Sequence, residues 1–132
     1  MIYTTYLLNS LDTVFCDSEL CGDSLFHTQI LCNEAFSFQL AVKAETAKGE
    51  DWKDCVELRA EIATDSCINV SVYTTENVPA TRVGYSISDD WFLKKKPGLY
   101  PDCLESRRKN YFSAPTRFWK TLWININEAS ED

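Results

Sequence analysis

The chain has 132 residues and a mass of 15.1 kDa, which fits one domain and leaves little room for a second. Hydrophobic residues make up 45% and charged residues 25%, and these ordinary globular values argue against disorder. Thirteen basic residues against twenty acidic ones give a net charge of −7, which repels nucleic-acid phosphates and anionic lipids. We therefore expect neither a nucleic-acid partner nor a membrane partner.

Apolar and polar residues alternate along much of the chain, and this period of two predicts strands. In chain order the candidate strands are residues 3–8, 13–16, 27–32, 36–43, 56–62, 68–72 and 121–126. Residues 52–63 also suit a helix, but strict alternation over seven residues favours a strand. The apolar positions predict a core made of Phe36, Phe38, Leu40, Val42, Val56, Leu58, Ile62, Ile68, Val70, Val72, Leu122 and Ile124.

Three turn-rich stretches separate these runs, and the longest covers residues 76–116. It contains all four prolines, so we expect it to wander across the surface with short extended pieces. Roughly seven short strands without a convincing long helix predict an all-β fold, an antiparallel immunoglobulin-like β-sandwich formed by a single domain over residues 1–132.

The six cysteines contain no Cys-x-x-Cys pair, and His27 is the only histidine, so the sequence does not predict a structural zinc site. Cys32 and Cys67 fall in candidate strands, where cysteine commonly acts as a small buried hydrophobe. We expect reduced, packed thiols and hence a reducing compartment. The first residues have no basic flank and no long apolar run, so no signal peptide is visible and a cytoplasmic location is favoured.

Residues able to carry chemistry are sparse in the sequence. His27 lacks a partner motif, the acidic residues 17–23 lack the order of a calcium loop, and the glycines do not cluster. We therefore predict no catalytic residue, no metal and no cofactor. Aromatic residues in and beside the loops form the remaining feature. They pack beneath the long loop, form an interface with another domain, which we favour, or form a platform for sugar rings: Trp52, Trp91, Phe92, Tyr100, Tyr111, Phe112 and Trp119.

Three segments resemble one known family when they are taken together. They are residues 33–42 (NEAFSFQLAV), residues 97–104 (PGLYPDCL) and residues 121–126 (TLWINI). In this order they resemble the amino-terminal β-sandwich domain of glycoside hydrolase family 123, a family of bacterial β-N-acetylgalactosaminidases and their relatives. The resemblance covers most of the chain, and the Pro-Gly-Leu-Tyr-Pro-Asp run is its most specific part. Cys103 stands where the family pattern leads us to expect proline.

The resemblance implies a non-catalytic accessory domain that packs against a downstream (β/α)8 catalytic barrel of the same polypeptide. The family's catalytic Asp-Glu pair belongs to that barrel, so no catalytic residue is carried over to this chain. The family continues beyond the residues that match 127–132 here, so we expect a domain truncated at its carboxyl end.

Two functions therefore stay open after the sequence is read. The first is the accessory domain of a glycosidase, and the second is a freestanding carbohydrate-binding or adhesion module. In either case we expect residues 91–104 to form a proline-stiffened loop that presents a partner surface. Its contacts with the barrel or with a glycan would come from Trp91, Tyr100, Asp102 and Leu104.

Overall fold

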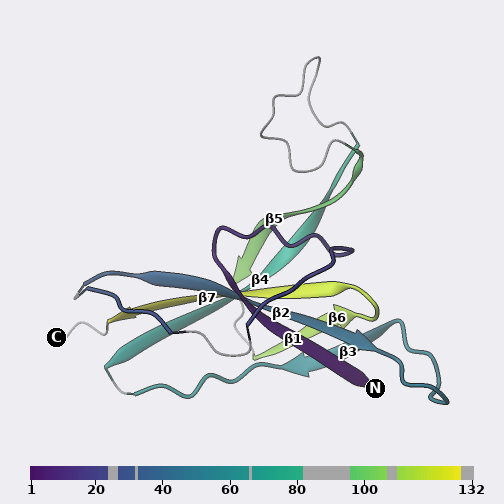
Figure 1. Cartoon of the computed structure of the whole chain (residues 1–132), viewed down its shortest axis with the longest axis horizontal. Helices are drawn as coiled ribbons and strands as arrows, with labels where there is room; N and C mark the ends of the chain where they lie inside the picture. Colours follow the sequence, from purple (N-terminus) through teal and green to yellow (C-terminus); the bar gives the residue numbers. More distant parts are fainter. Residues whose placement is uncertain (24–26, 32, 66, 82–95, 107–109, 129–132) are drawn as a thin grey trace.

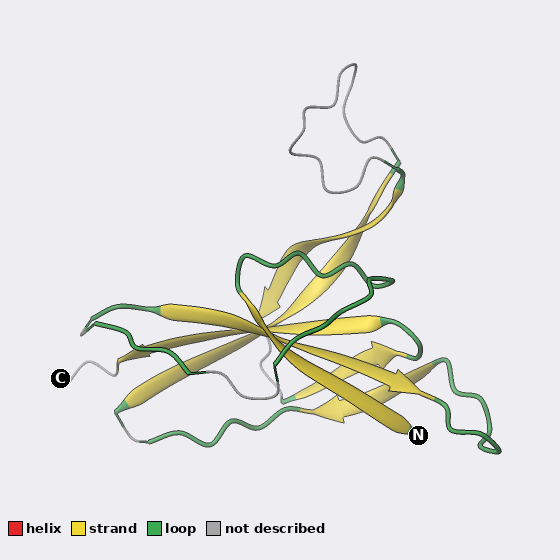
Figure 2. Cartoon of the chain, viewed as in Figure 1, coloured by secondary structure: helices red, strands yellow, loops and turns green. Residues whose placement is uncertain are grey.

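The computed structural model describes residues 1–23, 27–31, 33–65, 67–81, 96–106 and 110–128. Strands and loops make up this part of the chain, which contains no helix (Figure 2). The strands in chain order are β1 (Ile2–Asn9), β2 (Phe36–Glu45), β3 (Cys55–Arg59), β4 (Ile68–Ala80), β5 (Gly98–Ser106), β6 (Tyr111–Pro115) and β7 (Trp119–Glu128). The predicted all-β, antiparallel fold is confirmed, whereas its immunoglobulin-like connectivity stays a prediction.

The strands form two antiparallel sheets of unequal size. The larger sheet has the order β1-β2-β7-β4-β5, and the smaller one pairs β3 with β6 (Figure 1). β7 therefore lies at the centre of the larger sheet, although it comes last in the sequence among the strands. Its neighbours β2 and β4 pair with it along most of their common length.

One face of the larger sheet, which we call the inner face, packs against the smaller sheet. Residues directly opposite each other on paired strands share a face, and Leu40 of β2 lies opposite Leu122 of β7. Leu122 is buried in a cluster with Phe112 and Ala114 of β6, and Leu40 and Val72 pack beside it. Truncating a leucine in such a cluster removes roughly 2–5 kcal/mol of stability, which makes this contact the main link between the sheets.

The opposite face, which we call the outer face, is covered by residues 10–23, the covering segment. Val14 of this segment is buried with Leu8, Ala41 and Trp119, which belong to β1, β2 and β7. Three hydrogen bonds fasten the segment to the sheet: the backbone N–H of Trp119 donates to Cys16 O at 2.9 Å, its indole Nε1 to Ser18 O at 2.8 Å, and Leu7 N to Asp23 O at 2.8 Å. The larger sheet is therefore covered on both faces.

Lys120 is the one buried lysine among the described residues, and it lies on the inner face of β7. Its Nζ donates to the backbone carbonyl oxygen of Thr75 at 3.1 Å and to Glu76 Oε1 at 2.6 Å. A buried charge is tolerated when hydrogen bonds and an opposite charge replace its hydration, and both partners here come from β4. The side chain thus ties the central strand to the middle of β4.

The long alternating runs predict the strands well, but two short ones do not. Residues 13–16 form part of the covering segment and residues 27–31 form a loop, so both predicted strands are wrong there; residue 32 lies outside the described residues. Val14 is buried by packing on the outer face without any pairing to a neighbouring strand. Alternation over four residues does not distinguish a paired strand from a loop that buries one side chain against a sheet.

The expectation that residues 76–116 wander across the surface is also wrong where the structure describes them. β4 continues to Ala80, and β5 and β6 follow in the same stretch. Pro101 is accepted because β5 is an edge strand, where a missing N–H does not break the sheet. Residues 82–95 and 107–109 lie outside the described residues.

The predicted core is correct at its centre and wrong at one end. Val42, Leu122 and Ile124 are buried, whereas Ile62 is 40% exposed and Ile68 is 37% exposed. β3 ends at Arg59, so the smaller sheet stops before it reaches these two residues. The core is therefore shorter than the alternation in the sequence indicates.

The cysteines differ from the expectation of packed thiols. Five of them are described, all as free thiols, and Cys21, Cys55, Cys67 and Cys103 are exposed while Cys16 is half-buried. In particular, Cys67 precedes β4 at the surface, so its predicted burial is wrong, and Cys32 lies outside the described residues. Cysteine is often buried in proteins, but four of these cysteines are exposed because they lie on the solvent side of their segments.

We predict that at least four thiols of the native, unreduced protein react rapidly with Ellman's reagent. The reason is that four described cysteines are exposed and free. Cys16, which belongs to the covering segment, should react more slowly because it is half-buried. A native protein that yields fewer than four fast equivalents would contradict the surface positions of these thiols.

We also predict that Lys120→Met lowers the free energy of unfolding by roughly 1.5–3 kcal/mol, because methionine keeps the packing stem and loses the charged hydrogen bonds. Lys120→Ala should cost more, since it also leaves a cavity. Urea denaturation measures the free energy of unfolding of both variants. The matched control is Lys48→Met on an exposed loop, which should change stability by no more than about 0.5 kcal/mol. Equal stabilities of the Lys120 and Lys48 variants would show that the buried contact contributes nothing.

Candidate functional site

The predicted site residues that the structure describes lie on β5, not on a loop. Tyr100, Asp102 and Leu104 all fall within this strand, so the prediction of a proline-stiffened loop is wrong for them, and Trp91 lies outside the described residues. Asp102 and Leu104 contribute to the same pocket, and Tyr100 is held beside it. The structure therefore brings part of the predicted site together on a different element.

A β-bulge gives Asp102 its special position. Glu76 pairs with Cys103 and the next residue of β4, Asn77, pairs with Pro101, so Asp102 is an extra residue without a partner on β4. Pro101 has no N–H to donate, which favours such an irregularity on an edge strand. Bulges bend a strand and redirect its side chains, and they are common beside binding sites.

A pocket of about 180 Å³ lies between the covering segment and this part of β5. Its lining comes from the covering segment, from the outer face of the larger sheet, and from the bulge of β5. The lining residues are Ser10, Leu11, Asp12, Thr13, Val14, Gln39, Thr75, Pro101, Asp102, Leu104 and Trp123. We call it the Thr75 pocket.

The floor of the Thr75 pocket is set by strand register. Gln39 of β2 lies opposite Trp123 of β7, and Trp123 lies opposite Tyr73 of β4. Thr75 is two residues further along β4, and it lies opposite Leu104 of β5. Because side chains two apart on a strand share a face, Gln39, Trp123, Thr75 and Leu104 all belong to the outer face.

One wall of the pocket is the turn that follows β1, and Gln39 holds this turn in place. Its buried amide Nε2 lies within hydrogen-bond distance of three backbone carbonyl oxygens, at 3.1 Å from Asn9 O, 3.3 Å from Ser10 O and 2.6 Å from Asp12 O. The turn is closed further because Asn9 N donates to Asp12 Oδ2 at 2.9 Å. Asp12 is therefore fixed against the sheet although its residue is exposed.

The hydroxyl of Thr75 is the unusual polar group of this pocket. Thr75 is only 7% exposed, and its Oγ1 is buried without a hydrogen-bond partner among the described residues. Its backbone carbonyl, in contrast, accepts the hydrogen bond from Lys120 and cannot shift freely. A buried hydroxyl without a partner costs roughly 1–3 kcal/mol, so its presence beside a cavity needs a physical explanation.

Tyr100 lies next to the pocket and connects β5 to the covering segment. Its ring meets that of Phe15 edge-to-face, with 5.7 Å between the ring centroids and an angle of 83°. The Tyr100 hydroxyl donates to Lys96 O at 2.7 Å, which closes the start of β5. These contacts assign Tyr100 a supporting position rather than a place in the pocket lining.

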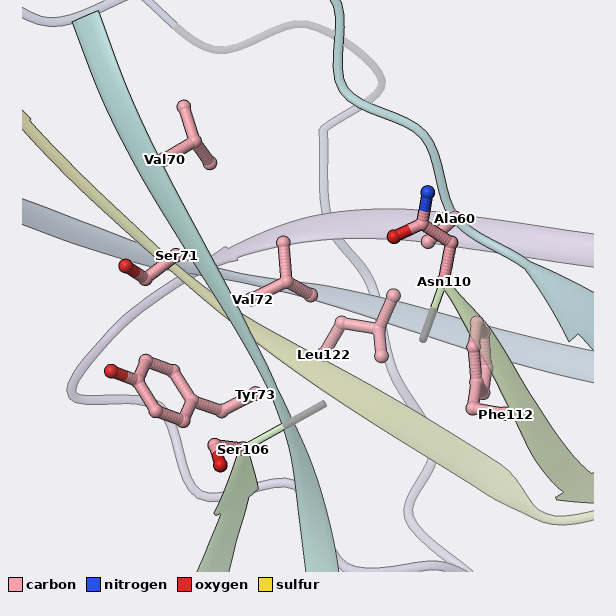
Figure 3. A pocket seen from close by; sticks show the side chains of 9 residues that line it. All are labelled: Ala60, Val70, Ser71, Val72, Tyr73, Ser106, Asn110, Phe112 and Leu122. Carbon is pink, nitrogen blue, oxygen red and sulfur yellow. The ribbon is translucent and has the colours of Figure 1, made fainter. Parts of the chain in front are cut away.

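A second cavity of about 350 Å³ lies on the inner face, beside the smaller sheet. Figure 3 shows Val70, Val72, Leu122 and Phe112 directed toward it, while Tyr73 points to the other side of β4. The cavity lies beside the hydrophobic core at the end of β3. Its lining combines apolar side chains of that core with polar residues, which are Ser71, Tyr73, Ser106 and Asn110.

Two further classes of site were tested on the described residues. That part of the chain has no group of three or more His, Cys, Asp or Glu side chains placed to hold a metal ion. Over the same residues, no helix is long and apolar enough to cross a membrane.

Sequence reasoning missed several residues of the Thr75 pocket. Trp123 carried the clearest signal, because a tryptophan stands between Thr121 and Asn125 on the nominally polar side of its strand. A large aromatic residue on that side indicates a second covered face. Thr75 carried no signal, since nothing in its sequence context distinguishes it from the neighbouring Thr74.

Comparisons with known proteins leave the chain without an assigned family. No family model matches the sequence, and no curated protein matches it.

We predict that Gly22→Ala destabilises the protein by roughly 1–3 kcal/mol through overpacking. A Cβ at this position would lie 2.9 Å from Tyr6 Cβ and 3.0 Å from Leu7 O, so the covering segment would have to move away from β1. Thermal unfolding measures the loss. The control is Asp23→Ala, which keeps the backbone hydrogen bond to Leu7 and changes an exposed side chain. A Gly22 variant as stable as this control would show that the segment is loosely held.

Proposed function

We propose that this chain is a non-catalytic accessory domain of a glycoside hydrolase, and that it docks onto a catalytic barrel through the outer part of β4 and β5. This outer part, residues 75–80 of β4 and 98–103 of β5, is called the arm below. The observation that carries the docking proposal is the exposure of apolar side chains on a hairpin beside which the described residues place no third strand. The glycosidase assignment rests on the resemblance of the sequence to family 123.

The arm extends from the body of the domain. β4 pairs with β7 only as far as Thr74, and beyond that point it pairs only with β5. Figure 1 shows the two strands leaving the rest of the sheet together. The base of the arm is covered, because Thr75 is buried and Tyr100 contacts Phe15 of the covering segment. Two-stranded ribbons bury little surface of their own, and isolated ones are marginally stable in water. Contact with a partner would supply the burial that the arm lacks.

Apolar residues occur on both sides of the arm. Val78 lies opposite Tyr100 and Pro79 lies opposite Leu99, and neighbouring pairs along a ribbon face opposite sides. Val78 is 43% exposed and Leu99 is 44% exposed. Single exposed apolar residues are ordinary, but here one lies on each side of a narrow ribbon, so a partner that encloses the arm would bury both. The Pro-Gly-Leu-Tyr-Pro-Asp run, which carries the family resemblance, forms most of the β5 strand of the arm.

We predict that Leu99→Ser affects the complete gene product more than this chain alone. The exposed side chain contributes little to the isolated domain, so its free energy of unfolding should change by no more than about 0.5 kcal/mol. In the complete product a buried interface residue should cost more than about 1 kcal/mol. Thermal unfolding of both proteins makes the comparison.

The matched control is Leu31→Ser, because Leu31 is exposed and lies outside the arm. It should leave both proteins unchanged. Equal effects of Leu99→Ser in the two proteins would refute docking through the arm. A gene product without a catalytic barrel would refute the accessory role. In that case, binding of this chain to an immobilised glycan would support the freestanding carbohydrate-binding module.

A further inference from the structure

We propose that the open edge of β1, residues 2–6, pairs with the same edge of a second copy of this chain, so that two larger sheets join across a two-fold axis. β1 and β5 are the two edge strands of the larger sheet, so this contact lies at the edge opposite the arm and does not depend on the proposed function (Figure 1). The proposal rests on the backbone groups of β1 that face away from the sheet, on its uncharged sequence, and on the match of that sequence with itself.

The hydrogen bonds of β1 show which of its residues face away from the sheet. The N–H of Leu7 donates to Asp23 O at 2.8 Å, on the side of β1 opposite to β2. Because the N–H and C=O groups of alternate residues point to the same side of a strand, those of Tyr3 and Thr5 also point away from β2. The described residues place no strand beside Tyr3 and Thr5, so both residues can pair with a further strand.

β1 lacks the features that usually prevent edge strands from pairing with other chains. Among the seven strands of the structure, β1 alone has neither a charged residue nor a proline, and its register with β2 is regular along its whole length. The other edge strand, β5, contains Pro101 and the bulge at Asp102. Charges, prolines and bulges protect an edge, so β5 is protected and β1 is not.

A two-fold axis at Thr4 uses the whole open edge. It places Tyr3 of one copy opposite Thr5 of the other, and the outward backbone groups of these two residues can exchange both of their hydrogen bonds. It also places Ile2 opposite Tyr6, and Thr4 opposite its own equivalent. Pairs of aromatic with β-branched residues and pairs of threonines stabilise neighbouring strands. Pairing ends there because the covering segment occupies the edge at the next position.

The surroundings of the open edge favour contact between two copies. Ile2 is 55% exposed and Tyr3 is 51% exposed, so each copy offers apolar surface that pairing would bury. The charged residues opposite them on β2 are Lys43 and Glu45, which form an ion pair at 3.3 Å. The neighbouring strand therefore brings no unpaired charge to the edge that a second copy would have to approach.

This contact closes on itself and gives a dimer. Both copies use the same edge, and the joined sheet then ends on each side in a β5 strand that its bulge protects. Pairing over residues 2–6 buries less than the roughly 1,200–2,000 Å² of stable complexes, so we expect a weak dimer with a dissociation constant of about 10–500 µM. The net charge of −7 on each copy opposes association, so added salt should strengthen it.

The test is sedimentation equilibrium of the full 132-residue chain at about 5–500 µM, in a reducing buffer because exposed thiols could otherwise link two copies. We expect an equilibrium between monomer and dimer that shifts toward the dimer as the salt concentration rises. A chain that stays monomeric over this range would overturn the proposal and leave the edge to a strand of a different protein. Assemblies that grow beyond a dimer would also overturn it.

Two variants examine the pairing itself. Thr5→Pro removes an outward N–H that does not bond to β2, so it should keep the sheet and weaken the dimer by at least about tenfold. Thr4→Glu lies opposite Lys43 within its own copy, which suits the fold, but it places two carboxylates opposite each other across the axis. Like charges in that position are destabilising, so this variant should also weaken the dimer by at least about tenfold.

The matched control is Thr64→Glu, which adds the same charge at an exposed position outside β1. Leu99→Ser is a second control, because it changes the arm and leaves β1 intact. Each control should keep the dissociation constant of the dimer within about twofold. Thr4→Glu remains decisive if Thr5→Pro disturbs folding, which circular dichroism detects. A dimer that is unchanged in Thr4→Glu, or weakened equally by Thr64→Glu or Leu99→Ser, would contradict pairing through β1.

Discussion

The larger sheet depends on pairing at β7, because this strand joins two halves that have no other strand between them. β1 and β2 lie on one side of it and β4 and β5 on the other. Its side chains are buried on both faces, with Leu122 against the smaller sheet and Trp119 under the covering segment. A change in β7 therefore affects the core, the covering segment and the connection to β4 at once.

The same strand links the architecture to the candidate site. Lys120 on the inner face of β7 holds the backbone of Thr75, while Trp123 on the outer face of β7 lines the same pocket as Thr75. The pocket is therefore built from regular strands rather than from loops alone. Its remaining wall is the turn after β1, which the side-chain amide of Gln39 fastens to the sheet.

Alternation in the sequence predicts β1, β2, β7 and the first part of β4, because a half-buried strand repeats every two residues. It does not predict β5. Alternation fails where contacts in the folded protein decide whether a residue is paired in a sheet or buried. Val14 alternates like a strand residue but packs as part of a covering loop, and Ile62 alternates like a core residue but lies beyond the end of the smaller sheet. Asp102 was identified as a site residue from the sequence, whereas Thr75 joins it only through the register of β4 and β5. That register includes a bulge, which no local pattern specifies.

The position of β7 in the sheet also affects how the protein is made on the ribosome. β2 and β4 emerge well before residues 119–128, and until then each has an unpaired edge of backbone N–H and C=O groups. At the usual translation rate of roughly 5–20 residues per second, the interval between the end of β4 and the start of β7 lasts about 2–8 seconds. Unpaired edges are templates for pairing with other chains. The nascent protein therefore keeps two unpaired strand edges, where misassembly can begin, until its central strand is synthesised.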